Sequence, residues 1–256
     1  MRRHFFLILL GAGFAASLLP LRAVPPRPVA GPPTPEELTN GQALAERLRS
    51  SAPAENSRIH GRLIIDLDDA SREIPIDCNV AVTATNWVTE YQTGGTSGNG
   101  PEHLVVTHCA SKPSQYLYAR AGSPSAPLPK LKTLAPSDAD IPLAGSDFSL
   151  SDLGLEFLHW PVQRQMKGEM RLGQPCYVLE SSRSGDGIVR IRSDIDEESG
   201  SPLIADAYDS DGRLVKEYSL HASSFKKVNG RWQVEKMEIS NKKTGSHTEL
   251  KFDLNK

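Results

Sequence analysis

The sequence predicts a mainly β fold with a few helices, in which one large antiparallel sheet curls into an incomplete, half-open β-barrel and helices plug its cavity. Apolar and polar residues alternate along most of the chain, which is the period of half-buried strands. Turn dipeptides such as Asp211-Gly212 and Asn229-Gly230 separate these stretches. About eleven strands with short connections form one wide sheet, which has to curl or split. A sandwich of two packed sheets remains the alternative.

Length and composition fit a globular protein that can bury a core. The chain has 256 residues, of which 38% are hydrophobic, enough for one large all-β domain or two small ones. It has 29 Lys and Arg against 31 Asp and Glu, and no basic run is interleaved with aromatic residues. We therefore expect a soluble monomer that does not bind nucleic acid.

Residues 1–23 are typical of a secretory signal peptide. Two arginines follow the first methionine, the apolar stretch 5–19 is short for a membrane span, and Ala23 offers a cleavage site. We therefore expect an exported, periplasmic protein. The arginine pair partly matches a twin-arginine signal, and an uncleaved anchor is a third interpretation.

Residues 24–34 form a proline-rich spacer before the main domain, which we expect to span 35–256. Proline fixes φ and lacks an amide donor, so the spacer is neither helix nor sheet interior. Thr34-Pro35-Glu36-Glu37 then combines a capping residue, a proline at the first helical position and an acidic first turn. This predicts a helix from about Pro35 to Arg49, with an apolar stripe of leucines.

The first half of the domain reads as a series of strands. Residues 59–67 and 74–82 alternate and are joined through Asp68-Asp69, which predicts a hairpin, and further strands are expected at 86–92, 103–109 and 115–120. Pro124 to Pro142 is expected to loop over the surface.

A helix with one apolar face is expected after this loop. Within Gly145 to Leu153, Ser149 and Asp152 form a capping box, and apolar residues follow at helical spacing as far as Trp160. This predicts a short helix over 149–160.

Strands follow from Gln163 to Leu254. Val189, Ile191 and Ile195 share one face of a strand, and Arg190, Arg192 and Asp194 share the other, so this strand is expected to be half-buried.

Several stretches together resemble the LolA-like outer-membrane lipoprotein-sorting proteins. The resemblance covers about Pro35 to Leu254, after a signal peptide, and rests on the sequences of residues 57–63, 145–153, 176–180, 209–216 and 237–241. It implies an incomplete barrel around a hydrophobic cavity. It also implies a periplasmic carrier that binds lipoprotein acyl chains or another lipid for sorting, with a possible membrane-bound loading or receiving partner and no bond-making chemistry.

Aromatic and methionine side chains are the candidate lining of that cavity, because acyl chains need apolar walls. Trp87 and Tyr91 share a strand face, Met166 and Met170 are expected to share another with Gly168 between them, and Phe148, Phe157 and Trp160 are candidates for a lid. Helix 149–160 is the expected gate. The competing interpretation is that all seven side chains pack in a filled core.

No catalytic residue, metal site or cofactor is expected. Residues 95–99, Gly-Thr-Ser-Gly-Asn, lack the last glycine of a nucleophile elbow, and the histidines are scattered singly. The segment Asp209 to Gly212 matches a hairpin turn better than a calcium loop. A lipid-sensing or protein-interaction module and a hydrolase with a dispersed site are the alternative functions.

Three cysteines leave at least one thiol unpaired in a monomer. In a meander of strands, Cys78 and Cys109 do not lie opposite each other, so we expect no disulfide and buried free thiols, Cys176 included.

Overall fold

The computed structural model describes residues 31–67, 70–95, 99–228 and 231–254, so the expected signal peptide lies outside the described residues. The helices are α1 (Pro35–Arg49) and α2 (Leu150–Leu153), with 3-10 turns η1 (Pro136–Asp138), η2 (Leu143–Gly145), η3 (Glu156–His159) and η4 (Ala222–Ser224). The strands are β1 (Ser57–Leu67), β2 (Ala70–Val82), β3 (Trp87–Thr93), β4 (Glu102–His108), β5 (Gln115–Arg120), β6 (Lys132–Leu134), β7 (Val162–Arg171), β8 (Gln174–Ser182), β9 (Ile188–Asp196), β10 (Pro202–Asp209), β11 (Leu214–Ser219), β12 (Phe225–Val228), β13 (Arg231–Val234), β14 (Lys236–Asn241) and β15 (His247–Phe252).

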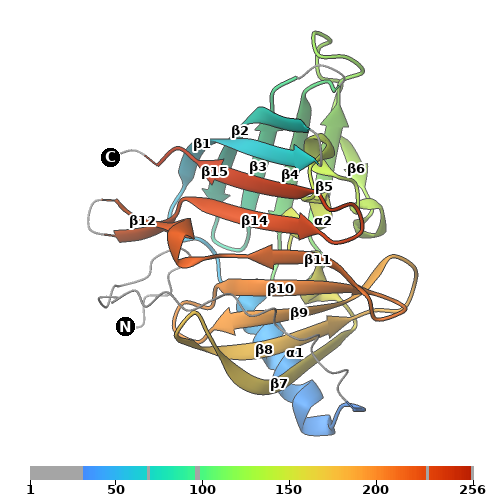
Figure 1. Ribbon diagram of the computed structural model, residues 1–256, viewed down its shortest axis with the longest axis vertical. Helices are drawn as coiled ribbons and strands as arrows, with labels where there is room; N and C mark the ends of the chain where they lie inside the picture. Colours follow the sequence, from blue (N-terminus) through green and yellow to red (C-terminus); the bar gives the residue numbers. More distant parts are fainter. Residues whose placement is uncertain (1–30, 68–69, 96–98, 229–230, 255–256) are drawn as a thin grey trace.

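One antiparallel sheet of thirteen strands forms the body of the molecule, in the order β6-β5-β4-β3-β2-β1-β15-β14-β11-β10-β9-β8-β7. The first and last strands of the sheet are not paired with each other, so the curved sheet stays open (Figure 1). The half-open sheet predicted from the sequence is confirmed. Strands β12 and β13 form a separate hairpin at one side.

Two meanders meet where β1 pairs with β15. In β1, Gly61 lies opposite Phe252, and a side chain at this position would collide with the backbone of Lys251. A glycine is therefore required where the two strands approach most closely. The predicted hairpin of β1 and β2 is confirmed, with Leu67 paired to Ala70.

Helix α1 lies against β7 to β9 on one side of the sheet (Figure 1). The face of the sheet that packs against α1 and residues 139–160 is called the inner face below, and the opposite face is the outer face. Thr34, the predicted capping residue, starts the helix and forms a capping box with Glu37. Leu44 and Leu48 are buried, and Gly41 sits directly on the backbone of Gln163, leaving no room for a methyl group.

Residues 139–160 are called the covering segment, and within it residues 149–160 do not form the single helix that was predicted. The capping box of Ser149 and Asp152 is present, but it opens a helix of only four residues, α2. Gly154 then lies against the Tyr116 hydroxyl, and Leu155 adopts a left-handed conformation with φ 51°, so the chain turns before η3 begins. The close approach to β5 therefore breaks the helix. The loop expected from Pro124 to Pro142 contains strand β6, and near its end Ala139 is buried while Pro142 is exposed.

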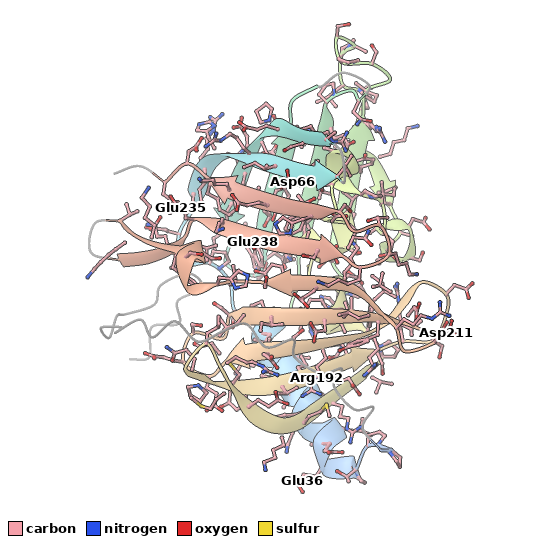
Figure 2. The ribbon with its side chains drawn as sticks, in the orientation of Figure 1. Glu36, Asp66, Arg192, Asp211, Glu235 and Glu238 are labelled. Carbon is pink, nitrogen blue, oxygen red and sulfur yellow. The ribbon has the colours of Figure 1, made fainter. Side chains whose placement is uncertain are left out.

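Strand β9 is buried on both faces, so the prediction of a half-buried strand is wrong. Asp194 is fully buried and accepts a hydrogen bond from Arg171 at 2.6 Å, and Arg192 pairs with Glu169 on β7. Arg192 lies on the outer face (Figure 2). Alternation of charged and apolar residues did not mean exposure here, because ion pairs satisfy the buried charges.

Candidate functional site

The inner face of the first half of the sheet is apolar and is roofed by the covering segment. The buried strand residues are Leu63, Ile65, Ile74, Ile76, Cys78, Tyr91, Leu104, Val106, Tyr116, Ile239, Leu250 and Phe252. They pack against Ala139, Leu143, Ala144, Phe148, Leu150 and Leu153 of the covering segment. Together these residues form the first apolar cluster.

A second apolar cluster fills the other half of the inner face. Leu44, Ala45 and Leu48 of α1 pack with Phe157, Leu158 and Trp160 at the end of the covering segment, and with Leu179, Ile191, Ile195 and Ala207 of the sheet. Each half of the inner face therefore carries an apolar cluster, and side chains of the covering segment and of α1 fill both.

A small cavity lies at the edge of the second cluster. It is lined by Leu48, Arg49, Trp87, His108, Cys109, Gly154, Leu155, Leu158 and His159, and its volume is about 20 Å³. A space of this size holds a water molecule and no acyl chain. An apolar ligand on the inner face would therefore have to displace part of the covering segment.

Buried polar side chains fasten the covering segment to the first half of the sheet. The carboxylate of Asp147 accepts hydrogen bonds from Ser246 at 2.6 Å and from Thr248 at 2.8 Å. The fully buried Glu102 on β4 accepts one from the backbone amide of Ala144 at 2.9 Å. Hydrogen bonds to charged groups are stronger than neutral ones, so these contacts hold the covering segment on the sheet.

Two further carboxylates join the covering segment to the sheet. Asp152 accepts a hydrogen bond from Lys216 on β11 at 2.9 Å, and Glu156 accepts one from Tyr116 on β5 at 3.0 Å. Burial raises the pKa of Glu156 to about 7, while the Tyr116 hydrogen bond acts in the opposite direction. The carboxyl of Glu156 therefore changes its charge near neutral pH.

Arg49 at the end of α1 ties the helix to the neighbouring loops. Its guanidinium donates to the carbonyl of Ala110 at 3.0 Å and to the carbonyl of Leu158. Burial lowers the pKa of Arg49. Nearby, the buried amide of Gln163 donates to the carbonyls of Phe157 and Trp160, which anchors η3 to β7.

The structure separates the seven predicted cavity residues into groups. Tyr91 and Phe148 meet in the first cluster, and Phe157 and Trp160 meet in the second. Trp87 lines the small cavity, with its ring stacked on His108 at 3.6 Å between centroids.

The two methionines lie apart from both clusters. A β-bulge in β7 shifts the register between Met166, opposite Val178, and Glu169, opposite Cys176. The extra residue reverses the alternation, so Met166 and Met170 point to opposite faces. The prediction that they share a face is wrong, and Met170 is 64% exposed.

Sequence reasoning missed the polar contacts of the site. Arg49, Tyr116 and Glu156 carry no local signal, because their partners are distant in sequence. Glu102 had one: it shares a strand face with Leu104 and Val106, so a period-two reading puts a carboxylate on an apolar face.

The segment Asp209 to Gly212 lies in the turn between β10 and β11. Asp209 accepts hydrogen bonds from the amides of Asp211 and Arg213 and closes the β10–β11 turn, which accounts for the calcium-like motif. In the part of the chain that the structure describes, no group of His, Cys, Asp or Glu is arranged to hold a metal ion. The serine of residues 95–99 lies outside the described residues.

The three cysteines do not form a disulfide. Cys78, Cys109 and Cys176 are free, and burial raises the pKa of Cys78 to about 12 and that of Cys176 to about 11.

Among the described helices, none combines the length and the apolar character needed to cross a membrane.

Three solved structures share this architecture. A DUF1329 family protein from Desulfovibrio piger has a TM-score of 0.66 at 17% identity, covering 85% of this chain and 91% of that chain. A putative outer membrane lipoprotein-sorting protein domain from Vibrio parahaemolyticus has a TM-score of 0.65 at 17% identity, over 85% and 92%. A LolA superfamily protein from Nitrosomonas europaea has a TM-score of 0.57 at 13% identity, over 84% and 91%. The chain therefore has the LolA-like fold, as the sequence resemblance implied.

The sequence itself assigns the chain to a family. The profile of a family described as "Uncharacterized protein" matches residues 98–255, which is more than half of the chain, so the chain belongs to that family. No curated protein matches the sequence.

Proposed function

We propose that this protein is a periplasmic carrier that holds lipoprotein acyl chains or another lipid on its inner face, for sorting to the outer membrane. One observation carries the proposal: a half-open LolA-like sheet whose inner face carries two apolar clusters and is covered by a segment separate from the sheet. Two solved proteins of this fold are described as lipoprotein-sorting or LolA superfamily proteins.

The physical driving force is burial of alkyl chains, at about 0.8 kcal/mol per methylene. In the present arrangement Phe148, Leu150 and Leu153 occupy the space that the chains would take. Loading moves the covering segment outward, and the apolar residues of the segment then contact the chains instead of the sheet. Transfer is binding and release, and no bond-making step is part of it.

Export completes the proposal. We infer that residues 1–23 are removed as a signal peptide of the ordinary or the twin-arginine type, that residues 24–34 are a spacer, and that residues 35–256 are the carrier domain. A membrane-bound partner would load or receive the chains, because escape of a long alkyl chain into water is prohibitive.

Native mass spectrometry of the mature protein, purified from the periplasm without detergent, tests the proposal directly. We expect adducts with the masses of lipids or acylated peptides. A photoreactive residue at Phe157 should crosslink to acyl chains in cells, whereas the same residue at the exposed Leu117, on the outer face, should not. Equal lipid crosslinking at both positions, or none at Phe157, would contradict carriage on the inner face.

The second candidate is a protein-interaction or lipid-sensing module on the same scaffold. The filled interior favours it, because the cavity of about 20 Å³ holds no ligand larger than water. For a protein-interaction module, the same native mass spectra would show a stoichiometric protein partner and no lipid adduct.

A further inference from the structure

The small cavity beside the second apolar cluster is lined by both apolar and polar side chains. Leu48 and Leu158 of the second cluster form one side, and the stacked rings of Trp87 and His108 form another. Arg49 and His159 complete the lining. The cavity is thus the place where polar groups reach the apolar inner face.

In this wall Trp87 has no hydrogen-bond acceptor and Arg49 has no carboxylate partner among the described residues. The indole N–H of Trp87 is buried and makes no hydrogen bond. Arg49 donates to two carbonyls, but among the described residues no carboxylate forms an ion pair with it, and Glu46, exposed on the same helix, acts only at longer range. A buried donor without an acceptor costs free energy, so the site favours a ligand with oxygen acceptors.

The imidazoles show the sign of the charge that the cavity favours. Burial, followed by the positive charge of Arg49, lowers the pKa of His159 to about 4. Burial, followed by the charge of His159, lowers the pKa of His108 to about 3. Both rings are therefore neutral at pH 7, and Arg49 is the cation of the cavity. A further cation is disfavoured there, and one negative charge is favoured.

We propose that this cavity is a subsite for the carboxylate of a long-chain fatty acid, with the alkyl chain entering the second apolar cluster between Leu48 and Leu158. The carboxylate would pair with Arg49 and accept the unused hydrogen bond of Trp87. This inference rests on the proposed function, since it names the chemistry of one ligand of the same inner face. The cavity must widen at η3 to admit the two oxygens, because its present volume is that of a water molecule.

The competing source of acceptor oxygens is an ester carbonyl, as in an acylated glycerol. The two sources differ in charge, so palmitic acid and methyl palmitate are the appropriate probes. Equilibrium dialysis of each radiolabelled probe against the mature protein at pH 8 gives the two dissociation constants. We expect palmitic acid to bind at least about tenfold more tightly, as hydrogen bonds to charged groups do.

Trp87→Phe removes the N–H and keeps an aromatic ring against His108. Trp232→Phe is the matched control, because Trp232 lies in β13, outside the thirteen-stranded sheet that carries the proposed subsite. We expect Trp87→Phe to weaken palmitic acid binding by about tenfold and Trp232→Phe to leave it unchanged. Equal effects of the two variants, or equal affinities for the acid and its ester, would overturn the carboxylate subsite while leaving lipid carriage intact.

A measurement on the unmodified protein guards against a variant that fails to fold. The chain has three tryptophans, so its ¹⁵N spectrum contains three indole N–H signals, which Trp160→Phe and Trp232→Phe assign by elimination. Palmitic acid should shift the Trp87 indole proton downfield and leave the signal of Trp232 in place. An unshifted Trp87 signal in protein saturated with palmitic acid would overturn the subsite, and failure of both probes to bind would overturn the carrier proposal with it.

Discussion

The two halves of the inner face are covered in different ways. Helix α1 covers the second half, and Gly41 brings it directly onto the backbone of β7. Residues 139–153 cover the first half with little regular structure, and buried side-chain hydrogen bonds from Asp147, Asp152 and Glu102 hold them. The helix is fixed by shape, whereas the covering segment is fixed by polar contacts that water can replace. We therefore expect the covering segment to open and α1 to stay.

The largest expected effect concerns the fixed side. Gly41→Ala would place a methyl group on the Gln163 backbone and should lower the free energy of unfolding by about 3 kcal/mol. Gly154→Ala, whose methyl group would meet the Tyr116 side chain rather than a backbone, should cost about half as much. Gly122→Ala has open space around it and is the control, expected within about 0.5 kcal/mol of wild type. Urea unfolding measures all three. A smaller cost for Gly41→Ala than for Gly154→Ala would reverse the comparison.

The second effect is a pH dependence of the contacts that hold the covering segment on the sheet. The pKa of Glu156 is raised to about 7 from 4.5, so the folded state binds the proton more tightly than the unfolded state. The resulting stabilisation is fully present below pH 4.5 and is lost as the pH rises through 7, with a size of about 2 kcal/mol. Urea midpoints of wild type and Glu156→Gln at pH 5 and 8 measure it.

His108 and His159 oppose this trend, because their pKa values are lowered in the folded state and their protonation at acid pH destabilises it. Both are retained in Glu156→Gln, so the difference between the two proteins isolates Glu156. The variant should lose less stability than wild type between pH 5 and 8. An identical pH dependence of the two proteins would mean that Glu156 does not help to hold the covering segment on the sheet.

Much of the fold followed from the sequence because its signals are local. The capping residue Thr34 and the capping box of Ser149 were predicted and are present, and the hairpin of β1 and β2 was predicted and is present. The curved sheet followed from strand number and turn spacing. Local signals failed where a distant strand intervenes. Tyr116 meets Gly154 and breaks the predicted helix, and the bulge in β7 moves Met170 to the other face.

The site was less predictable for the same reason. The aromatic residues were named as cavity lining, and Tyr91 and Phe148 do lie on the inner face. Their division into two clusters depends on which half of the sheet each covering element packs against. The small cavity depends on Arg49 and His108, which come from a helix and a strand far apart in the chain. A pattern of side chains in one segment carries no information about such partners.

A third experiment compares the two halves by hydrogen exchange. Thr248→Val removes the hydroxyl that donates to the Asp147 carboxylate and accepts from the Asp147 amide, at nearly constant shape. The covering segment should lose protection by about 1–2 kcal/mol, while α1 should keep it. Thr107→Val, on the outer face of β4, is the control. Equal loss of protection in α1 and the covering segment would mean that the two open as one unit.

The smallest effect concerns β7, the edge strand beneath α1. The bulge leaves Met166 half-buried opposite Val178 and Met170 in solvent. Met166→Ala should therefore cost about 1 kcal/mol of unfolding free energy, and Met170→Ala less than about 0.5 kcal/mol. If the strand continued in regular alternation, the two methionines would share one face and their substitutions would have similar costs. Urea unfolding of the two variants therefore tests whether β7, the edge strand that supports α1, contains the bulge. It also tests the assignment of α1 to the fixed half of the inner face.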